Sequence, residues 1–220
     1  MTATSCNSGP ITRQSIRSRM VAHEPRIVAE KPGMRQAAVA VILRETSEHR
    51  PGSEVLFIRR AEKKADPWSG QMAFPGGHRE PDDPSLQHAA MRETLEEIGL
   101  DLNAHADYLG ALDQEHAVGR GRPMNMLIAP HVFQLNPEPA SRSNFDSDVL
   151  TLNHEVAEVV WTPLAPILSA EAHTQEERWI NGTPTPFGGY RISGDHFVWG
   201  LTYRMLHSLC RVLDENWRQP

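Results

Sequence analysis

The chain has few cysteines and no long apolar run. Its only two cysteines are Cys6, in an expected tail, and Cys210, so neither a disulfide framework nor a thiolate metal site is indicated. No segment approaches the roughly 20 apolar residues that span a bilayer, and residues 1–34 lack the apolar core of a secretory signal. We therefore expect a cytoplasmic protein that makes no contact with a membrane.

Positive charge is also scarce. Lys and Arg total 22 against 28 Asp and Glu, which gives a formal net charge of −6. This balance argues against a general binder of nucleic-acid polymers, although small nucleotides stay possible ligands. The 11 histidines show no dense ligand spacing, so no zinc site is predicted. No Ser-His-Asp arrangement can be identified from residue order, which disfavours nucleophilic acyl transfer.

The most informative segment is residues 74–100, where a glycine turn precedes a helix expected over residues 84–98. Gly76 and Gly77 let the chain turn tightly and approach a ligand closely. Asp83 is expected to cap the helix, and Gly99 to end it in the left-handed conformation.

Three carboxylates lie in the last two turns of this helix: Glu93, Glu96 and Glu97. At about 100° per residue they fall within a sector of roughly 100° on one face, where they repel one another. Such crowding indicates a bound cation, and oxygen-only ligands favour Mg²⁺ or Mn²⁺ over zinc. Arg92 can orient one of the carboxylates. The alternative interpretation is a solvated acidic helix face.

This segment resembles the Nudix box, Gly-x5-Glu-x7-Arg-Glu-U-x-Glu-Glu-x-Gly-U with U aliphatic, of Mg²⁺-dependent hydrolases that act on nucleoside diphosphates linked to another group. The matching residues are Gly77, Arg92, Glu93, Glu96, Glu97, Gly99 and Leu100. The interval from Gly77 to Arg92 is one residue longer than the pattern, Asp82 and Asp83 replace its inner Glu, and Thr94 replaces an aliphatic residue. A Phe-Pro-Gly-Gly box with this longer spacing resembles the coenzyme A pyrophosphatase branch.

The resemblance implies an α/β/α sandwich with a mixed sheet, and a metal held by Glu93, Glu96, Glu97 and Gly77. It also implies coenzyme A or an acyl-CoA as substrate, cleaved to 3′,5′-ADP and (acyl-)4′-phosphopantetheine. ADP-ribose, nucleotide sugars and damaged nucleotides are the alternative substrates, and a nucleotide sensor without turnover is the alternative function. An extra basic motif of the branch is incomplete here, because residues 55–70 carry one residue too many and lack its second arginine.

Catalysis needs a general base and cationic groups for phosphate. Glu155 is our first choice of base outside the box, with a box glutamate, Glu115 or Glu158 as alternatives. Gly76, Gly77 and four arginines are the predicted substrate contacts, the arginines being Arg59, Arg60, Arg120 and Arg122. Arg120 and Arg122 lie in an expected loop over residues 114–124 that could close over phosphates. A solvated strand end and a soluble surface loop are the alternatives for these arginines.

Residues 1–34 are predicted to form a basic arm, flexible or packed on a partner, and residues 35–220 the hydrolase domain with a C-terminal helix. The arm makes a homodimer plausible, and its Arg- and Ser-rich, acid-poor composition is also typical of an organelle transit peptide. Mixed strands with helices on two faces favour an α/β/α sandwich. The expected strands cover residues 35–44, 54–59, 106–113, 125–135 and 154–161, followed by a short helix at 164–171, a hairpin at 177–193 and a helix at 196–215.

Aromatic residues gather between Trp179 and Tyr190, together with Phe187. Their rings could stack on a base or line a channel for a long apolar tail. Packing of Trp179 and Phe187 in the core is the alternative.

Overall fold

A central mixed sheet organises the molecule. The structure is a computed structural model, and it describes residues 11–46, 52–64, 68–119, 122–137, 149–180 and 182–220. The strand order is β3-β2-β1-β7-β5, with β4 paired to β1, β6 to β7 and β8 to β2. Only the β1–β7 pairing is parallel among those described for this sheet. The strands are β1 (Arg35–Glu45), β2 (Ser53–Arg60), β3 (Met72–Ala73), β4 (Gly76–His78), β5 (Ala106–Ala111), β6 (Glu115–Gly119), β7 (Arg122–Leu135) and β8 (Val156–Pro163).

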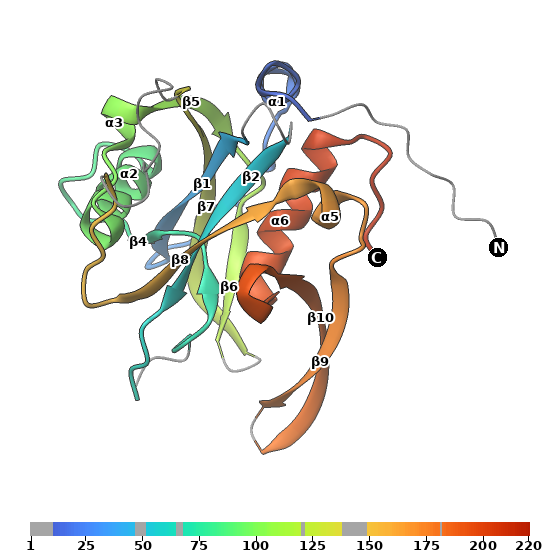
Figure 1. Ribbon diagram of the computed structural model, residues 1–220. Coiled ribbons are helices and arrows are strands. Elements are labelled where there is room, and N and C mark those ends of the chain that lie inside the picture. Colours follow the sequence, from blue (N-terminus) through green and yellow to red (C-terminus); the bar gives the residue numbers. More distant parts are fainter. Residues whose placement is uncertain (1–10, 47–51, 65–67, 120–121, 138–148, 181) are drawn as a thin grey trace.

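Helices cover both faces of this sheet (Figure 1). Ala38, Ala40 and Ile42 of β1 pack in one apolar cluster with α2 (Leu86–Ile98), whereas Val41 and Leu43 pack in a second cluster with α6 (Gly200–Leu213). Neighbouring residues of a strand point to opposite faces, so the nearly continuous apolar run of β1 fills both layers. The predicted α/β/α sandwich with a mixed sheet is confirmed.

A second, three-stranded antiparallel sheet follows the central one. It consists of β9 (His173–Ile180), β10 (Thr183–Ile192) and β11 (His196–Trp199), in the order β11-β10-β9. The β9–β10 hairpin projects beyond the central sheet, as the orange ribbon in Figure 1 shows. The prediction of a helix over 196–215 was therefore wrong at its start, because residues 196–199 pair with β10 before α6 begins. Short helices α3 (Leu102–His105), α5 (Leu164–Leu168) and η1 (Ser193–Asp195) complete the described elements.

Part of the expected N-terminal arm is a helix packed on the domain. Helix α1 (Arg13–Ala22) has a capping box at Thr12 and buries Ile16 and Met20 in the apolar cluster around α6. Arg13 and Arg17 both pair with Asp107 of β5, at 2.8 and 3.1 Å. Hydrogen bonding to Arg13 first of all lowers the pKa of Asp107. Residues 13–22 thus differ from the flexible arm that the basic composition predicted, and residues 1–10 lie outside the description.

Two local predictions in the box and the following loop are corrected. Ser85, not Asp83, caps α2 by accepting a hydrogen bond from the His88 amide, while Gly99 ends the helix at φ 73° as predicted. The expected loop at residues 114–124 is largely a β-hairpin, because β6 pairs with β7 from Glu115 onward. Among the helices of the described residues, none is long and apolar enough to cross a membrane.

Candidate active site

Four residues of the glycine turn and the box helix line a large cavity between the central sheet and the three-stranded sheet. Its volume is about 1230 Å³, and Gly76, Gly77, Glu93 and Glu97 form part of its wall. Glu93 and Glu97 are four residues apart on α2, so they project from the same side of the helix. The cavity wall thus contains the glycine turn and two of the three glutamates that were predicted to bind the metal.

The two glycines are required for this packing. Gly76 has φ +150°, and a Cβ added to it would lie 2.2 Å from the carbonyl oxygen of Ala38 in the neighbouring strand β1. A Cβ on Gly77 would lie 2.4 Å from Oε1 of Glu93. β4 therefore passes close against both β1 and the Glu93 carboxylate, as only residues without a side chain allow.

Glu97 is a buried carboxylate at the centre of the site. Its side chain is 2% exposed, and its Oε2 accepts a hydrogen bond of 2.8 Å from the Gly76 amide. Burial raises the pKa of Glu97 to about 7, and the negative charges of Glu93 and Glu155 act in the same direction. Burial also raises the pKa of Glu93, which Arg92 partly opposes. Carboxylates in so unfavourable an electrostatic setting are stabilised by an added positive charge, which a proton or a metal cation can supply.

Arg92 joins the box residues into one network. It donates to both carboxylate oxygens of Asp83 at 3.1 and 3.0 Å and to the His78 carbonyl at 2.9 Å. It also pairs with Glu93 at 3.2 Å and with Glu96 at 3.1 Å. Hydrogen bonding to Arg92 lowers the pKa of Asp83. Asp83 thus holds Arg92 in place instead of capping the helix, and Arg92 positions carboxylates without lining the cavity itself.

Glu96 lies apart from the other two box glutamates. Its side chain is 53% exposed, is paired with Arg92, and is not part of the cavity wall. In the part of the chain that the structure describes, no three His, Cys, Asp or Glu side chains are placed to hold one metal ion together. The expected trio is therefore not assembled in this conformation. Breaking the exposed ion pair between Glu96 and Arg92 would cost only about 0–1 kcal/mol, so Glu96 could turn toward a metal at little cost. Metal ligation by Glu96 and by Gly77 stays a prediction.

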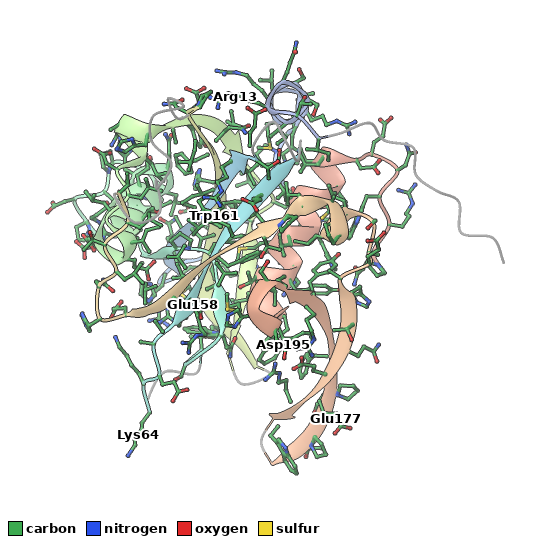
Figure 2. The ribbon with its side chains drawn as sticks, viewed as in Figure 1. Arg13, Lys64, Glu158, Trp161, Glu177 and Asp195 are labelled. Atoms are coloured by element: carbon green, nitrogen blue, oxygen red, sulfur yellow. The ribbon has the colours of Figure 1, made fainter. Side chains whose placement is uncertain are left out.

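Of the predicted bases outside the box, only Glu155 lies in the cavity wall. Lys63 Nζ contacts Glu155 Oε1 at 2.5 Å, and this hydrogen bond lowers the pKa of Glu155. Glu158 on β8, labelled in Figure 2, pairs instead with Arg59 at 3.2 Å and His196 at 3.3 Å. Glu115 is buried in an ion pair with Arg204. Neither Glu115 nor Glu158 is part of the cavity wall, although Arg204, the partner of Glu115, is.

The four arginines that were predicted to bind phosphate lie in different places. Arg60 lines the cavity, where its positive charge opposes the rise in the pKa of Glu97. Arg59 points to Glu158 and is not part of the wall. Arg120 lies outside the described residues, and Arg122 is described only by its backbone in β7, paired with Gly119.

The far wall of the cavity was not identified as one site from the sequence. Arg178, Trp179, Phe187 and Trp199, from three different strands, line the same cavity as the glutamates. Strand pairing within the small sheet brings these four side chains together. Their spacing along the chain does not predict this, and the only indication in the sequence is the richness of the segment in aromatic residues.

Comparisons with known proteins show the family of the chain. The sequence profile of the NUDIX domain matches residues 34–181. The human "Mitochondrial coenzyme A diphosphatase NUDT8" is 30% identical over 171 residues, covering 76% of this chain and 65% of that protein. An uncharacterized protein of Schizosaccharomyces pombe is 39% identical over 123 residues, covering 55% of this chain. The chain spans only 35% of the length of that yeast protein.

One solved structure resembles the fold over most of the chain. The crystal structure of a MutT/nudix family protein from Enterococcus faecalis matches with a TM-score of 0.51 and 17% identity, covering 93% of this chain and 70% of that one. At this identity the likeness concerns the fold alone.

Proposed function

This chain belongs to the Nudix family, and we propose that it hydrolyses the diphosphate linkage of a nucleoside-diphosphate derivative with Mg²⁺ or Mn²⁺. The observation that carries the proposal is the meeting of Glu93, Glu97 and the Gly76–Gly77 turn in one cavity. The two carboxylates have raised pKa values there. They are hard oxygen donors, so they fit a divalent cation of this type.

We assign the metal site to Glu93 and Glu97, with Glu96 and Gly77 as further ligands. When bound, the cation would neutralise charge on the diphosphate oxygens and lower the pKa of the attacking water. Gly77 leaves room for the Glu93 carboxylate. Arg92 fixes the direction of the carboxylate groups it contacts.

Two further cavity residues have roles in the proposal. Arg60 supplies positive charge to the cavity wall beside Glu97, where it can contact a phosphate oxygen. Glu155 is the proposed general base, because Lys63 keeps it ionised and therefore able to accept a proton.

The base assignment predicts a shift in the pH dependence of the rate. Lys63→Met removes the partner that lowers the pKa of Glu155, so a base that must be ionised becomes active only at higher pH. We expect the acidic limb of the kcat profile to move upward in pH, and Glu155→Gln to lower kcat by about 10²- to 10⁴-fold. Because the ordinary pKa of this carboxyl is 4.5 and Lys63 lowers it, rate profiles from about pH 3 to pH 8 are needed to measure both effects. An unmoved limb together with a fully active Glu155→Gln enzyme would assign the base to another residue.

Coenzyme A or an acyl-CoA is the substrate that we propose. The longer Phe-Pro-Gly-Gly box supports it, as does the similarity to a protein named as a coenzyme A diphosphatase. The cavity of about 1230 Å³ is also larger than a diphosphate alone requires. ADP-ribose, nucleotide sugars and damaged nucleotides remain the rival substrates.

Product analysis distinguishes these substrates. Purified protein with Mg²⁺ is incubated with coenzyme A, ADP-ribose or a nucleotide sugar at equal concentration, and products are separated by liquid chromatography with mass detection. We expect 3′,5′-ADP and 4′-phosphopantetheine from coenzyme A, with the largest kcat/KM of the panel. Faster cleavage of ADP-ribose would reassign the substrate while keeping the hydrolase, and inactivity on the whole panel would favour the nucleotide sensor.

Three finer expectations from the sequence stay predictions. They are a cytoplasmic location, a possible homodimer, and the division into an arm at residues 1–34 and a hydrolase domain at 35–220. Within the arm, Ile16 and Met20 of α1 belong to the same apolar cluster as α6.

A further inference from the structure

The three-stranded sheet gives the cavity a wall of different chemistry from the box. Arg178, Trp179, Phe187 and Trp199 line it on that side, whereas Glu93 and Glu97 line it on the other. Pockets for small molecules commonly have volumes of about 300–1000 Å³, and this one reaches about 1230 Å³. A ligand bound at the carboxylates can therefore extend to the small sheet.

Flat aromatic surface is available on this wall. The indole of Trp179 is 72% exposed, although the residue belongs to a regular strand. The rings of Phe187 and Trp199 meet edge to face with centroids 4.9 Å apart, and both side chains are partly exposed. Such rings lose contact with water when a second planar ring covers them.

A cation lies beside these rings. The guanidinium carbon of Arg178 is 5.7 Å from the Trp199 ring centroid and 5.2 Å from that of Phe197. One terminal nitrogen of Arg178 donates to Glu176, while its buried Nε has no hydrogen-bond partner among the described residues. An arginine anchored in this way next to aromatic faces combines the two contacts that recognise a phosphorylated nucleoside, which are stacking on the base and pairing with phosphate.

The wall is fixed relative to the glycine turn. The hydroxyl of Thr202, in the first turn of α6 directly after β11, donates to the carbonyl of Met72 in β3 at 3.1 Å, and this contact is buried. Met72 precedes Gly76 by four residues in the chain, and both line the cavity. The aromatic wall of the small sheet and the box glutamates thus line one continuous cavity, and this contact holds them in fixed positions relative to each other.

Resting on the proposed hydrolase function, we propose that Trp179, Phe187 and Trp199 bind the nucleobase of the substrate by stacking, and that Arg178 binds a phosphate on the same nucleoside. The large side chains on this part of the wall are three aromatic rings and a guanidinium, which match a planar base and an anion. An aliphatic chain would be matched by aliphatic side chains, so the remainder of the substrate is assigned to the rest of the cavity.

Adenosine 3′-monophosphate tests this subsite without any hydrolysis, because it carries a base and a phosphate but no diphosphate. In a nuclear magnetic resonance titration we expect it to shift the indole N–H signals of Trp179 and Trp199. The signal of Trp161, which packs against Arg44 and does not line the cavity, should stay in place. Arg178→Gln should weaken the binding of this nucleotide more than the binding of adenosine. Pantetheine is the comparison ligand, because it has no base and no phosphate. A shift of the two indole signals on adding pantetheine would overturn the proposal. So would the absence of any shift with either compound at millimolar concentration.

Kinetics give a second readout. Trp179→Ala should raise the KM for coenzyme A about tenfold, which corresponds to about 1.4 kcal/mol, because one stacking side chain is removed, while kcat stays within about twofold. Glu177→Ala is the matched control, because Glu177 is exposed on the same projecting hairpin and does not line the cavity (Figure 2). Equal KM values for wild type and Trp179→Ala would contradict the subsite. Since nucleotide binding is measured apart from turnover, failure of the subsite and failure of the hydrolase proposal are distinguishable.

Discussion

Glu97→Gln is expected to lower the rate of diphosphate hydrolysis by about a thousandfold or more, equivalent to at least about 4 kcal/mol of transition-state stabilisation. Gln keeps the size of the side chain and can still accept the Gly76 amide, but it removes the charge that the proposed metal requires. The rate is measured with coenzyme A and saturating Mg²⁺. A variant within tenfold of wild type would exclude Glu97 from the metal site.

The same substitution should stabilise the metal-free protein. The pKa of Glu97 is raised by burial from 4.5 to about 7, so between these values the folded state holds a proton that the unfolded chain has lost. The free energy of unfolding therefore falls as pH rises through this window, and above pH 7 the full cost of burying the charge applies. At pH 8 in EDTA we expect Glu97→Gln to be more stable by about 1–3 kcal/mol.

Urea unfolding at pH 8 and pH 5 measures this effect, with Glu96→Gln as control. Glu96 is about half exposed, so its replacement should change stability little at either pH. A gain for Glu97→Gln that disappears toward pH 5 would identify the titrating group. Equal stability of wild type and Glu97→Gln at pH 8 would show that Glu97 bears no such cost.

Substitutions at the two neighbouring glycines should have opposite effects on fold and activity. Gly76→Ala places a methyl group 2.2 Å from the Ala38 carbonyl at a φ that favours glycine, and neither strand can move without breaking the β1–β4 pairing. We expect a loss of about 2–5 kcal/mol in the free energy of unfolding. Gly77→Ala instead meets the end of the Glu93 side chain, which can rotate away.

Gly77→Ala should therefore fold with a melting temperature near that of wild type and lose at least about a hundredfold in kcat/KM, because displaced catalytic groups cost about this factor. Thermal unfolding and steady-state kinetics of both variants provide the comparison. A fully active Gly77→Ala enzyme would show that the position of Glu93 against Gly77 does not matter for turnover.

The sequence predicted the parts of the site that depend on local structure. Helix α2 and its C-cap Gly99 follow from spacing and capping residues, and the glutamates follow from the same short segment. The family and the fold class are confirmed. Asp83 and Ser85 both belong to residue types that cap helices, and only the tertiary contact of Asp83 with Arg92 shows why Ser85 takes that role.

Long-range contacts account for what the sequence did not predict. Glu93 and Glu96 share a helix face by spacing and both pair with Arg92, yet the Glu93 side chain is 17% exposed and that of Glu96 is 53% exposed. Trp199 reaches the cavity through pairing of β11 with β10. Helix α1 was missed because its arginines dominate the composition, while two apolar side chains a turn apart, Ile16 and Met20, make the packing contact.

Binding of Mn²⁺ followed by electron paramagnetic resonance tests the central claim most directly, because free and bound Mn²⁺ are distinguished without any substrate. We predict saturable binding to the wild-type protein at pH 8, loss of that binding in a Glu93→Gln/Glu97→Gln double variant, and competition by Mg²⁺. Unchanged Mn²⁺ binding by the double variant, or no saturable binding by the wild-type protein at millimolar Mn²⁺, would contradict the account.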